Sequence, residues 1–176
     1  RQSTVGGRLF KDILLKKGIA VGIKVDQGLT PFNNSTVEKI TQGLGDLPER
    51  LKEYYAMGAR FAKWRGVFSI GAATPSNECI GANAQLLAQY ARLCLKQSIM
   101  PIVEPEVLND GNHDIHTTFE TTKKVLSAVF AALAKEHVPV KKILLKPNMV
   151  VPGEKGSAVL PEVVAEMTVE CFKAVL

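Results

Sequence analysis

The stretch ILLKPN (residues 143–148) decides the fold, because its apolar run stops at a charged residue, Lys146. Three earlier runs have the same form, and their charged residues are Lys24, Lys63, Arg65, Glu104 and Glu106. The successive charges at positions 24, 63, 104 and 146 are separated by 39, 41 and 42 residues. A charge at the end of a buried strand is costly unless it is paired or takes part in chemistry. The even spacing therefore predicts one site built by a repeating fold.

Helical patterns fill the intervals between these runs. The segment DLPE begins at Asp46 and places an N-cap, an early proline and an acid where a capping box has them. Asp114 is expected to cap a later helix in the same chain. We expect further helices over residues 6–18, 76–97 and 161–176, and a polar loop over residues 26–45. The strands are expected over residues 19–25, 59–64, 99–103 and 143–146.

Strands that alternate with helices predict a parallel sheet with right-handed crossovers. The strand segments are apolar on both faces, as a sheet covered by helices requires. Both an open doubly wound sheet and a β/α barrel satisfy this pattern. No GxGxxG follows a strand, so the dinucleotide interpretation is weak. Polar residues gather at the carboxyl ends of all four strands, which is where a barrel keeps its active site.

The composition is that of an ordinary globular chain, with 46% hydrophobic and 22% charged residues among 176. Charges interrupt the apolar stretches well short of a membrane span, and the first residues show no apolar signal core. The formal charge of +5 comes from basic residues in runs no longer than two. This spread argues against a nucleic-acid surface and suits small anionic substrates such as sugar phosphates.

Three cysteines without a CxxC pattern are expected to be free thiols in a reducing compartment. Together with the missing signal core they predict a cytoplasmic protein, and the sequence leaves organellar targeting open.

Lys146 is the residue with the most specific chemistry. Loss of solvation at the end of a buried strand favours the neutral amine, which can attack a carbonyl and form a Schiff base. The alternative is a strand-end lysine whose ammonium simply reaches solvent. Lys63 could favour the neutral amine further, or form a salt bridge to a glutamate.

Glu104 and Glu106 are two residues apart, so on an extended strand they share a face. They are candidates for proton transfer, and equally for charge partners that hold the lysines in place. Arg65 has the fork geometry that suits phosphate, and Lys24 is a candidate for an anionic group.

Other kinds of site are disfavoured by spacing. Residues 109–114 resemble part of a calcium loop but lack its length and closing glutamate. The three histidines form neither HxH nor HExxH, so we expect no metal. Neither GxSxG nor a P-loop is present.

Several long motifs in register have a known counterpart. GIKVDQG, GARFAKWR, PIVEPEVLNDGNHD and LLKPNMVVPG, in this order and spacing, closely resemble class I fructose-bisphosphate aldolases. TQGLGDLPER and TPSNECIGANAQLLAQYARLC resemble the connecting segments of that family. The likeness runs from about Gly6 to the last helix, so it covers essentially the whole chain.

The resemblance implies an α/β protein of the (β/α)8 TIM barrel family. This chain would cover about half of the barrel, strands three to six, as a single domain over residues 1–176. The resemblance also implies a homotetramer of glycolysis that cleaves fructose 1,6-bisphosphate into dihydroxyacetone phosphate and glyceraldehyde 3-phosphate without a metal or another cofactor.

The same resemblance assigns roles by motif. Lys146 looks like the Schiff-base lysine and Glu104 like the proton-shuttling acid/base. Glu106 looks like its neighbour in the site, and Lys63 like the lysine that stabilises charged intermediates. The cations that contact the substrate would be Arg65 and Lys24.

Two departures from the family pattern bear on activity. Gln27 stands where the family commonly has a lysine, and a complete barrel of this family is roughly twice as long. The alternative function is a catalytically inactive aldolase-like piece that acts through association or as a binding scaffold. A metal-dependent aldolase is a third interpretation, and it fits the histidine pattern poorly.

Overall fold

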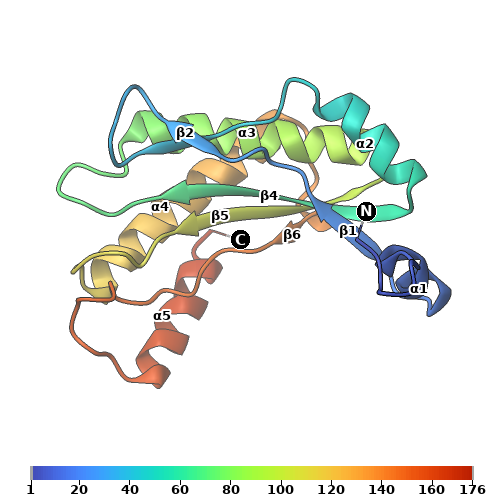
Figure 1. The fold of residues 1–176 in the computed structure, drawn as a ribbon. Coiled ribbons are helices and arrows are strands. Elements are labelled where there is room, and N and C mark those ends of the chain that lie inside the picture. The colour runs from blue at the N-terminus through green and yellow to red at the C-terminus, as the bar shows by residue number, and fades with distance from the viewer. Residues whose placement is uncertain (1, 176) are drawn as a thin grey trace.

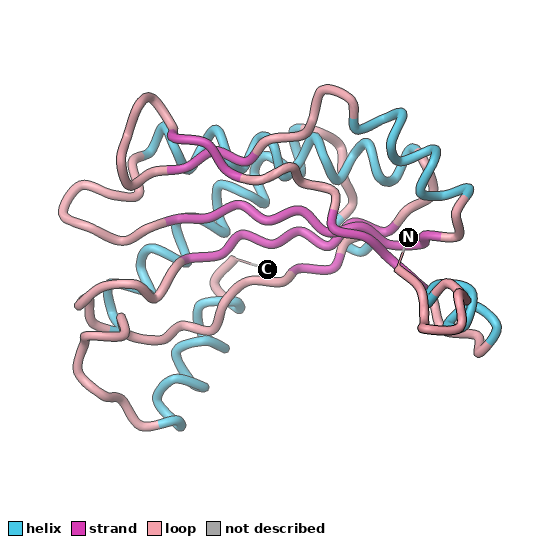
Figure 2. The backbone as a smooth tube through the Cα atoms, viewed as in Figure 1, coloured by secondary structure: helices cyan, strands magenta, loops and turns pink. Residues whose placement is uncertain are grey.

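The computed structural model describes residues 2–175 and is built around a four-stranded parallel sheet. The strand order is β1 (Val21–Lys24), β4 (Ala59–Phe68), β5 (Met100–Val107) and β6 (Leu144–Leu145). The helices α2 (Leu47–Ala56), α3 (Asn77–Lys96) and α4 (Ile115–Lys135) lie between consecutive strands of the chain. Figure 1 shows α2 and α3 along one side of the sheet, and Figure 2 traces the strands side by side. The expected parallel α/β fold is confirmed.

Side-chain alternation divides the sheet into an apolar face and a charged face. On β4, Ala62 and Trp64 are fully buried, whereas Lys63 between them is only partly buried. Trp64 stacks on Tyr90 of α3 with ring centroids 5.6 Å apart, and the Tyr90 hydroxyl donates to the Ala62 carbonyl at 2.7 Å. Helices therefore cover the face of the sheet that carries Trp64. The charged residues alternate with these buried ones along the strand, so their side chains lie on the opposite face.

The central strands are longer than the sequence pattern predicted. β4 continues to Phe68 rather than ending near Trp64, and β5 continues to Val107 rather than Val103. Lys63, Arg65, Glu104 and Glu106 thus lie within strands and not at their ends. The expectation was wrong because charges on the open face are paired and do not interrupt the ladder.

An antiparallel hairpin occupies part of the segment that was expected to be a polar loop. It consists of β2 (Leu29–Pro31) and β3 (Lys39–Thr41). The Thr41 hydroxyl donates to the carbonyl of Arg65 at 2.7 Å. The Glu38 carboxylate accepts hydrogen bonds from the backbone N–H and the hydroxyl of Ser76, at 2.7 and 3.0 Å. These bonds attach the hairpin to β4 and to the start of α3.

Helix starts follow the expectation at one aspartate and not at the other. Asp114 Oδ1 accepts from the Thr117 N–H at 2.8 Å, so its capping role is confirmed. Asp46 makes no side-chain capping bond, and its carboxylate instead lies 3.0 Å from Nε of Arg50. The capping box was a wrong prediction, since Asp46 has φ −99° and ψ 7° and not the extended backbone that an N-cap needs.

Two loops at the carboxyl end of the sheet are joined by backbone hydrogen bonds. The N–H groups of Gly153, Glu154 and Lys155 donate to the carbonyls of His113, Asn109 and Gly111, at 2.9, 2.8 and 2.8 Å. The loop that follows β5 is therefore fastened to the segment that follows β6.

The remaining elements lie at the ends of the chain and around a second core. α5 (Pro161–Lys173) packs on α4, where Ile115, Leu126, Val150 and Cys171 are buried together. α1 (Phe10–Lys16) precedes β1, and the 3-10 turn η1 (Val140–Lys142) precedes β6. All three cysteines are buried free thiols, as expected. Within residues 2–175, none of the helices has both the length and the apolarity needed to cross a membrane.

Candidate active site

Glu104 is the central group of the charged face. It lies in the middle of β5 and is only 3% exposed. Its Oε1 accepts a hydrogen bond from Nζ of Lys146 at 2.5 Å, and its Oε2 lies 2.8 Å from Nζ of Lys63 in an ion pair. One buried carboxylate thus brings together two of the three lysines that the sequence singled out.

The sheet register explains this convergence. Lys63 of β4 lies beside Ile102 of β5, two residues before Glu104 and on the same face. The Lys146 N–H donates to the carbonyl of Val103 at 2.8 Å, which places Lys146 on the other side of β5 directly after β6. The two lysines therefore approach Glu104 from opposite neighbours of its own strand.

The charge state of Glu104 follows from these contacts. Burial opposes ionisation of the carboxyl, but the hydrogen bonds from Lys146 and Lys63 and the charges of both ammonium groups outweigh it. The net result is a pKa of Glu104 below its ordinary value. Glu104 is therefore ionised at neutral pH and is a proton acceptor in direct contact with Lys146.

Lys146 differs from the sequence expectation in its solvation. Its side chain is 56% exposed, so it is not desolvated by the described part of the chain.

Arg65 and Glu106 form a second pair farther along the same strands. Nε of Arg65 is bonded to Oε2 of Glu106, and both side chains are partly exposed. The pair lies nearer to the carboxyl ends of β4 and β5 than Lys63 and Glu104 do. An arginine at that rim keeps its other nitrogen atoms available for an anionic group.

Lys24 pairs with a residue that the sequence analysis did not single out. Its ammonium is bonded to Oδ1 of Asp26, whose side chain is only 4% exposed. Lys24 lies beside Lys63 in the register of β1 and β4, so it belongs to the same face. Asp26 was missed because it opens the segment that was taken for a polar loop.

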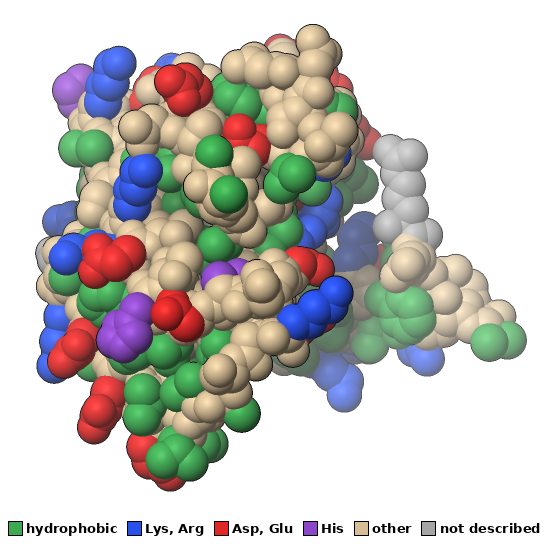
Figure 3. Space-filling model, turned by 90° about the vertical axis from the view of Figure 1, so that its left-hand side faces the viewer, with side chains coloured by type: hydrophobic (Ala, Val, Ile, Leu, Met, Phe, Trp, Pro, Cys, Tyr) green, Lys and Arg blue, Asp and Glu red, His purple; other side chains and the backbone are tan. Residues whose placement is uncertain are grey.

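No group of three or more histidine, cysteine, aspartate or glutamate side chains that could hold a metal ion occurs among residues 2–175. Figure 3 views the molecule from the side toward which β4 and β5 point, and acidic and basic side chains are interspersed over it. The candidate site itself consists of paired charges, because Glu104 pairs with Lys63 and Lys146, and Arg65 pairs with Glu106.

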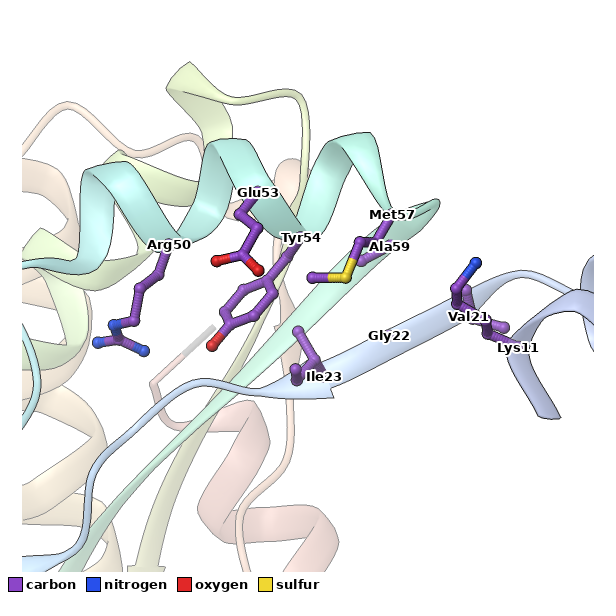
Figure 4. Close-up of a pocket in the computed structure, with 9 residues that line it drawn as sticks. All are labelled: Lys11, Val21, Gly22, Ile23, Arg50, Glu53, Tyr54, Met57 and Ala59. Carbon is purple, nitrogen blue, oxygen red and sulfur yellow. The ribbon is translucent and has the colours of Figure 1, made fainter. Parts of the chain in front are cut away.

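A separate hollow of about 410 Å³ lies between β1 and α2 (Figure 4). Its wall includes Arg50 and Tyr54 of α2, Met57 directly after that helix and Ile23 of β1, and Lys11 of α1 lies at one end. The lysines paired with Glu104 do not line this hollow. It is therefore not the place where the chemistry of the charged face occurs.

The chain is similar to known proteins of one family. The family model described as "Glycolytic: Fructose-bisphosphate aldolase class-I" matches residues 1–176. The chain is 48% identical over 172 residues to fructose-bisphosphate aldolase 5, cytosolic, of Arabidopsis thaliana, covering 98% of this chain and 48% of that protein. It is 47% identical over 176 residues to a probable fructose-bisphosphate aldolase class 1 of Xylella fastidiosa, covering 99% of this chain and 52% of the relative.

A solved structure of fructose-bisphosphate aldolase from Plasmodium falciparum, in complex with TRAP and a small-molecule inhibitor, superposes with a TM-score of 0.95 at 43% identity. The match covers 99% of this chain and 51% of that one. The chain thus spans about half the length of the relatives it matches, and its sheet corresponds to half of their barrel.

Proposed function

This chain belongs to the class I fructose-bisphosphate aldolase family, and on that premise we propose that its charged face performs Schiff-base cleavage of fructose 1,6-bisphosphate. The products are dihydroxyacetone phosphate and glyceraldehyde 3-phosphate, and the reaction is reversible. The observation that carries the proposal is the contact between Glu104 and Nζ of Lys146 at 2.5 Å, with Lys63 on the same carboxylate. A nucleophile beside its own proton acceptor is the arrangement that covalent catalysis needs.

The first step forms the covalent bond. Glu104 takes a proton from the Lys146 ammonium, and the free amine adds to the C2 ketone of the sugar. The resulting carbinolamine loses its hydroxyl as water when Glu104 returns the proton. The product is an iminium ion between C2 and Nζ of Lys146.

The second step breaks the carbon–carbon bond. A carboxylate removes the proton from the C4 hydroxyl, and the aldehyde leaves as the electrons of the C3–C4 bond move into the iminium. The enamine that remains is protonated at C3 and hydrolysed, which releases dihydroxyacetone phosphate and restores the lysine. Lys63 stabilises the negative charge that develops during these steps.

The other charged residues hold the substrate. Arg65 and Lys24 contact its anionic groups, and Glu106 orients Arg65 through their ion pair. No cofactor is required for this chemistry. We expect the whole protein to be a homo-oligomer, a tetramer by family resemblance. The cytosolic names of the Arabidopsis relatives support a cytoplasmic location.

Borohydride trapping tests the proposal. The chain is incubated with dihydroxyacetone phosphate, reduced with sodium borohydride, digested and analysed by mass spectrometry. A substrate adduct on the peptide that contains Lys146 is expected, and Lys146→Met should abolish it. Adducts spread evenly over many lysines would count against a specific Schiff-base site.

A second candidate function, association without catalysis, is favoured by one observation. Lys146 is half-exposed and Leu144 of β6 is 51% exposed, so the charged face is open at this edge of the described chain. A folded chain that gives no adduct on Lys146, but forms a stable complex with segments that complete the barrel, would support this candidate instead.

A further inference from the structure

A buried aspartate lies beneath one of the exposed lysines of the charged face. The side chain of Asp26 is 4% exposed and that of Lys24 is 52% exposed, although their side chains are bonded. The two residues are separated by one position, so on extended backbone they lie on the same side. The Asp26 carboxylate is thus buried below the surface of the charged face, and the Lys24 ammonium bonded to it is exposed.

The backbone on both sides of Asp26 is held by hydrogen bonds. The Val25 N–H donates to the carbonyl of Lys63 at 3.0 Å, and Arg50 Nη1 donates to the carbonyl of Val25 at 2.8 Å. After Asp26, the Gln27 N–H donates to the carbonyl of Gln42 at 2.8 Å. Figure 4 shows Arg50 extending from α2 toward the layer of β1. These bonds fix the direction in which the carboxylate points.

The carboxylate is not fully satisfied in this position. Oδ2 of Asp26 is inaccessible to solvent and has no hydrogen-bond partner among the described residues. A buried carboxylate with one free oxygen is costly to folding. Stability of the loop therefore does not explain why an aspartate stands here.

The neighbouring charges indicate what the aspartate does. Lys24 lies beside Lys63 in the sheet register, and Lys63 is already paired with Glu104. Two cations side by side repel each other, and a long lysine chain without a fixed partner spreads into solvent. A fixed anion under Lys24 counters both effects.

We propose that Asp26 is a positioning residue: its fixed carboxylate holds the Lys24 ammonium over the charged face, where it receives an anionic group of a sugar phosphate. The part that concerns the ligand rests on the function proposed above. The part that concerns the lysine does not, and the two parts can be tested separately.

The first experiment measures Lys24 itself. Lysine side chains of the intact chain are labelled with 15N and 13C, and the Lys24 signals are assigned by comparison with Lys24→Arg. We expect the Lys24 ammonium to be ordered and slow in solvent exchange, and Asp26→Asn to make it as mobile as a fully solvated lysine. Asp26→Glu should restore part of the order. Unchanged Lys24 signals in Asp26→Asn would overturn the proposal.

The control is Glu136→Gln. Glu136 pairs with Nε of Arg92 at 2.7 Å and with Gln85 at 2.6 Å, between α3 and the end of α4 and away from the charged face. This variant should leave the Lys24 signals unchanged. If it frees Lys24 as Asp26→Asn does, general loosening of the fold is the cause and positioning by Asp26 is refuted.

The second experiment measures binding of fructose 1,6-bisphosphate by calorimetry. Asp26→Asn should weaken binding about tenfold, the effect of one charge-assisted hydrogen bond. In a Lys24→Met background the same change should have little further effect, because the lysine that it positions is gone. Additive losses would refute action through Lys24. Absence of binding by the unmodified chain, with Lys24 freed in Asp26→Asn, would count against the proposed function alone.

Discussion

Replacement of Glu104 by glutamine should lower stability by an amount that depends on pH. The variant keeps the size of the side chain and removes the charge that pairs with Lys146 at 2.5 Å and Lys63 at 2.8 Å. A hydrogen bond to a charged group contributes about 1.5–3 kcal/mol, but exposed ion pairs contribute only about 0–1 kcal/mol. Because the two lysine side chains are 56% and 31% exposed and regain water, we expect a total loss of about 2 kcal/mol at pH 7.

The sign of the pH dependence follows from the lowered pKa of Glu104. A carboxyl whose pKa is lower in the folded state stabilises the fold fully above its unfolded-state pKa of about 4.3. That contribution is lost as pH falls through the folded-state pKa, which lies lower still. The difference in stability between the natural chain and Glu104→Gln should therefore be largest near neutral pH and should vanish in acid.

Urea denaturation followed by circular dichroism at pH 7, 5 and below 3 measures this difference, and thermal scans should show a shift of about 4–8 °C at pH 7. Glu106→Gln is the matched control, since it removes a partly exposed partner and should cost less than about 1 kcal/mol. If the difference in free energy of unfolding between the natural chain and Glu104→Gln were the same below pH 3 as at pH 7, the reasoning would be refuted. Packing, and not charge, would then be the source of the difference. The same variant should reduce trapping on Lys146 by at least about 100-fold if Glu104 moves protons.

Three further outcomes are expected. Tyr90→Phe removes the hydroxyl that donates to the Ala62 carbonyl at 2.7 Å. It should lower the free energy of unfolding, measured by urea titration, by about 1–2 kcal/mol. An unchanged midpoint of urea unfolding would contradict a role for this bond. Gly22→Ala would place a Cβ 2.1 Å from the ring of Phe61, so we expect a loss of about 1–3 kcal/mol in the same assay, and a neutral effect would show that the ring moves freely. Burial and the nearby Glu38 raise the pKa of Cys79 to about 11, and burial raises the pKa of Cys94 to about 12. A thiol reagent at pH 8 should therefore label these two cysteines only when the chain unfolds. Rapid labelling of the native chain would contradict this.

The parallel sheet could be predicted from the sequence because every interval between charged runs holds a helix of sufficient length. The choice between a doubly wound sheet and a barrel came only from the family resemblance. Family membership could also be predicted, since long motifs such as GARFAKWR and LLKPNMVVPG occur in register. The start of α4 could be predicted from the local sequence, since Asp114 is a good N-cap residue, and in the structure it accepts from the Thr117 N–H.

Other features depend on contacts that local patterns do not contain. The ends of β4 and β5 were placed too early, because a charge within a strand looks the same as a charge after it until its partner across the sheet is known. Asp46 fits a capping box in sequence, but it has a non-extended backbone and its carboxylate pairs with Arg50, which also donates to the carbonyl of Val25. The strands β2 and β3 are three residues long each, and β2 is exposed throughout, so the hairpin leaves no period-2 pattern in the sequence.

The sequence predicted which residues make up the candidate site, and it offered ion pairs between its lysines and glutamates only as an alternative, without fixing which residues pair. The structure brings Lys63, Glu104 and Lys146 together, and it joins Arg65 to Glu106. Their catalytic roles stay predictions. Asp26 was missed because a lone aspartate after a strand is common in turns, and only its burial beneath Lys24 distinguishes it.

The backbone hydrogen bonds between residues 109–113 and residues 153–155 have a consequence for protein engineering. If only one of these two segments were replaced with that of a homologue, the three backbone hydrogen bonds between them could be lost, because the new backbone need not match the old partner. Chimeras should therefore exchange both segments together. Any difference in specificity that these loops cause between homologues should be transferred only when both are exchanged.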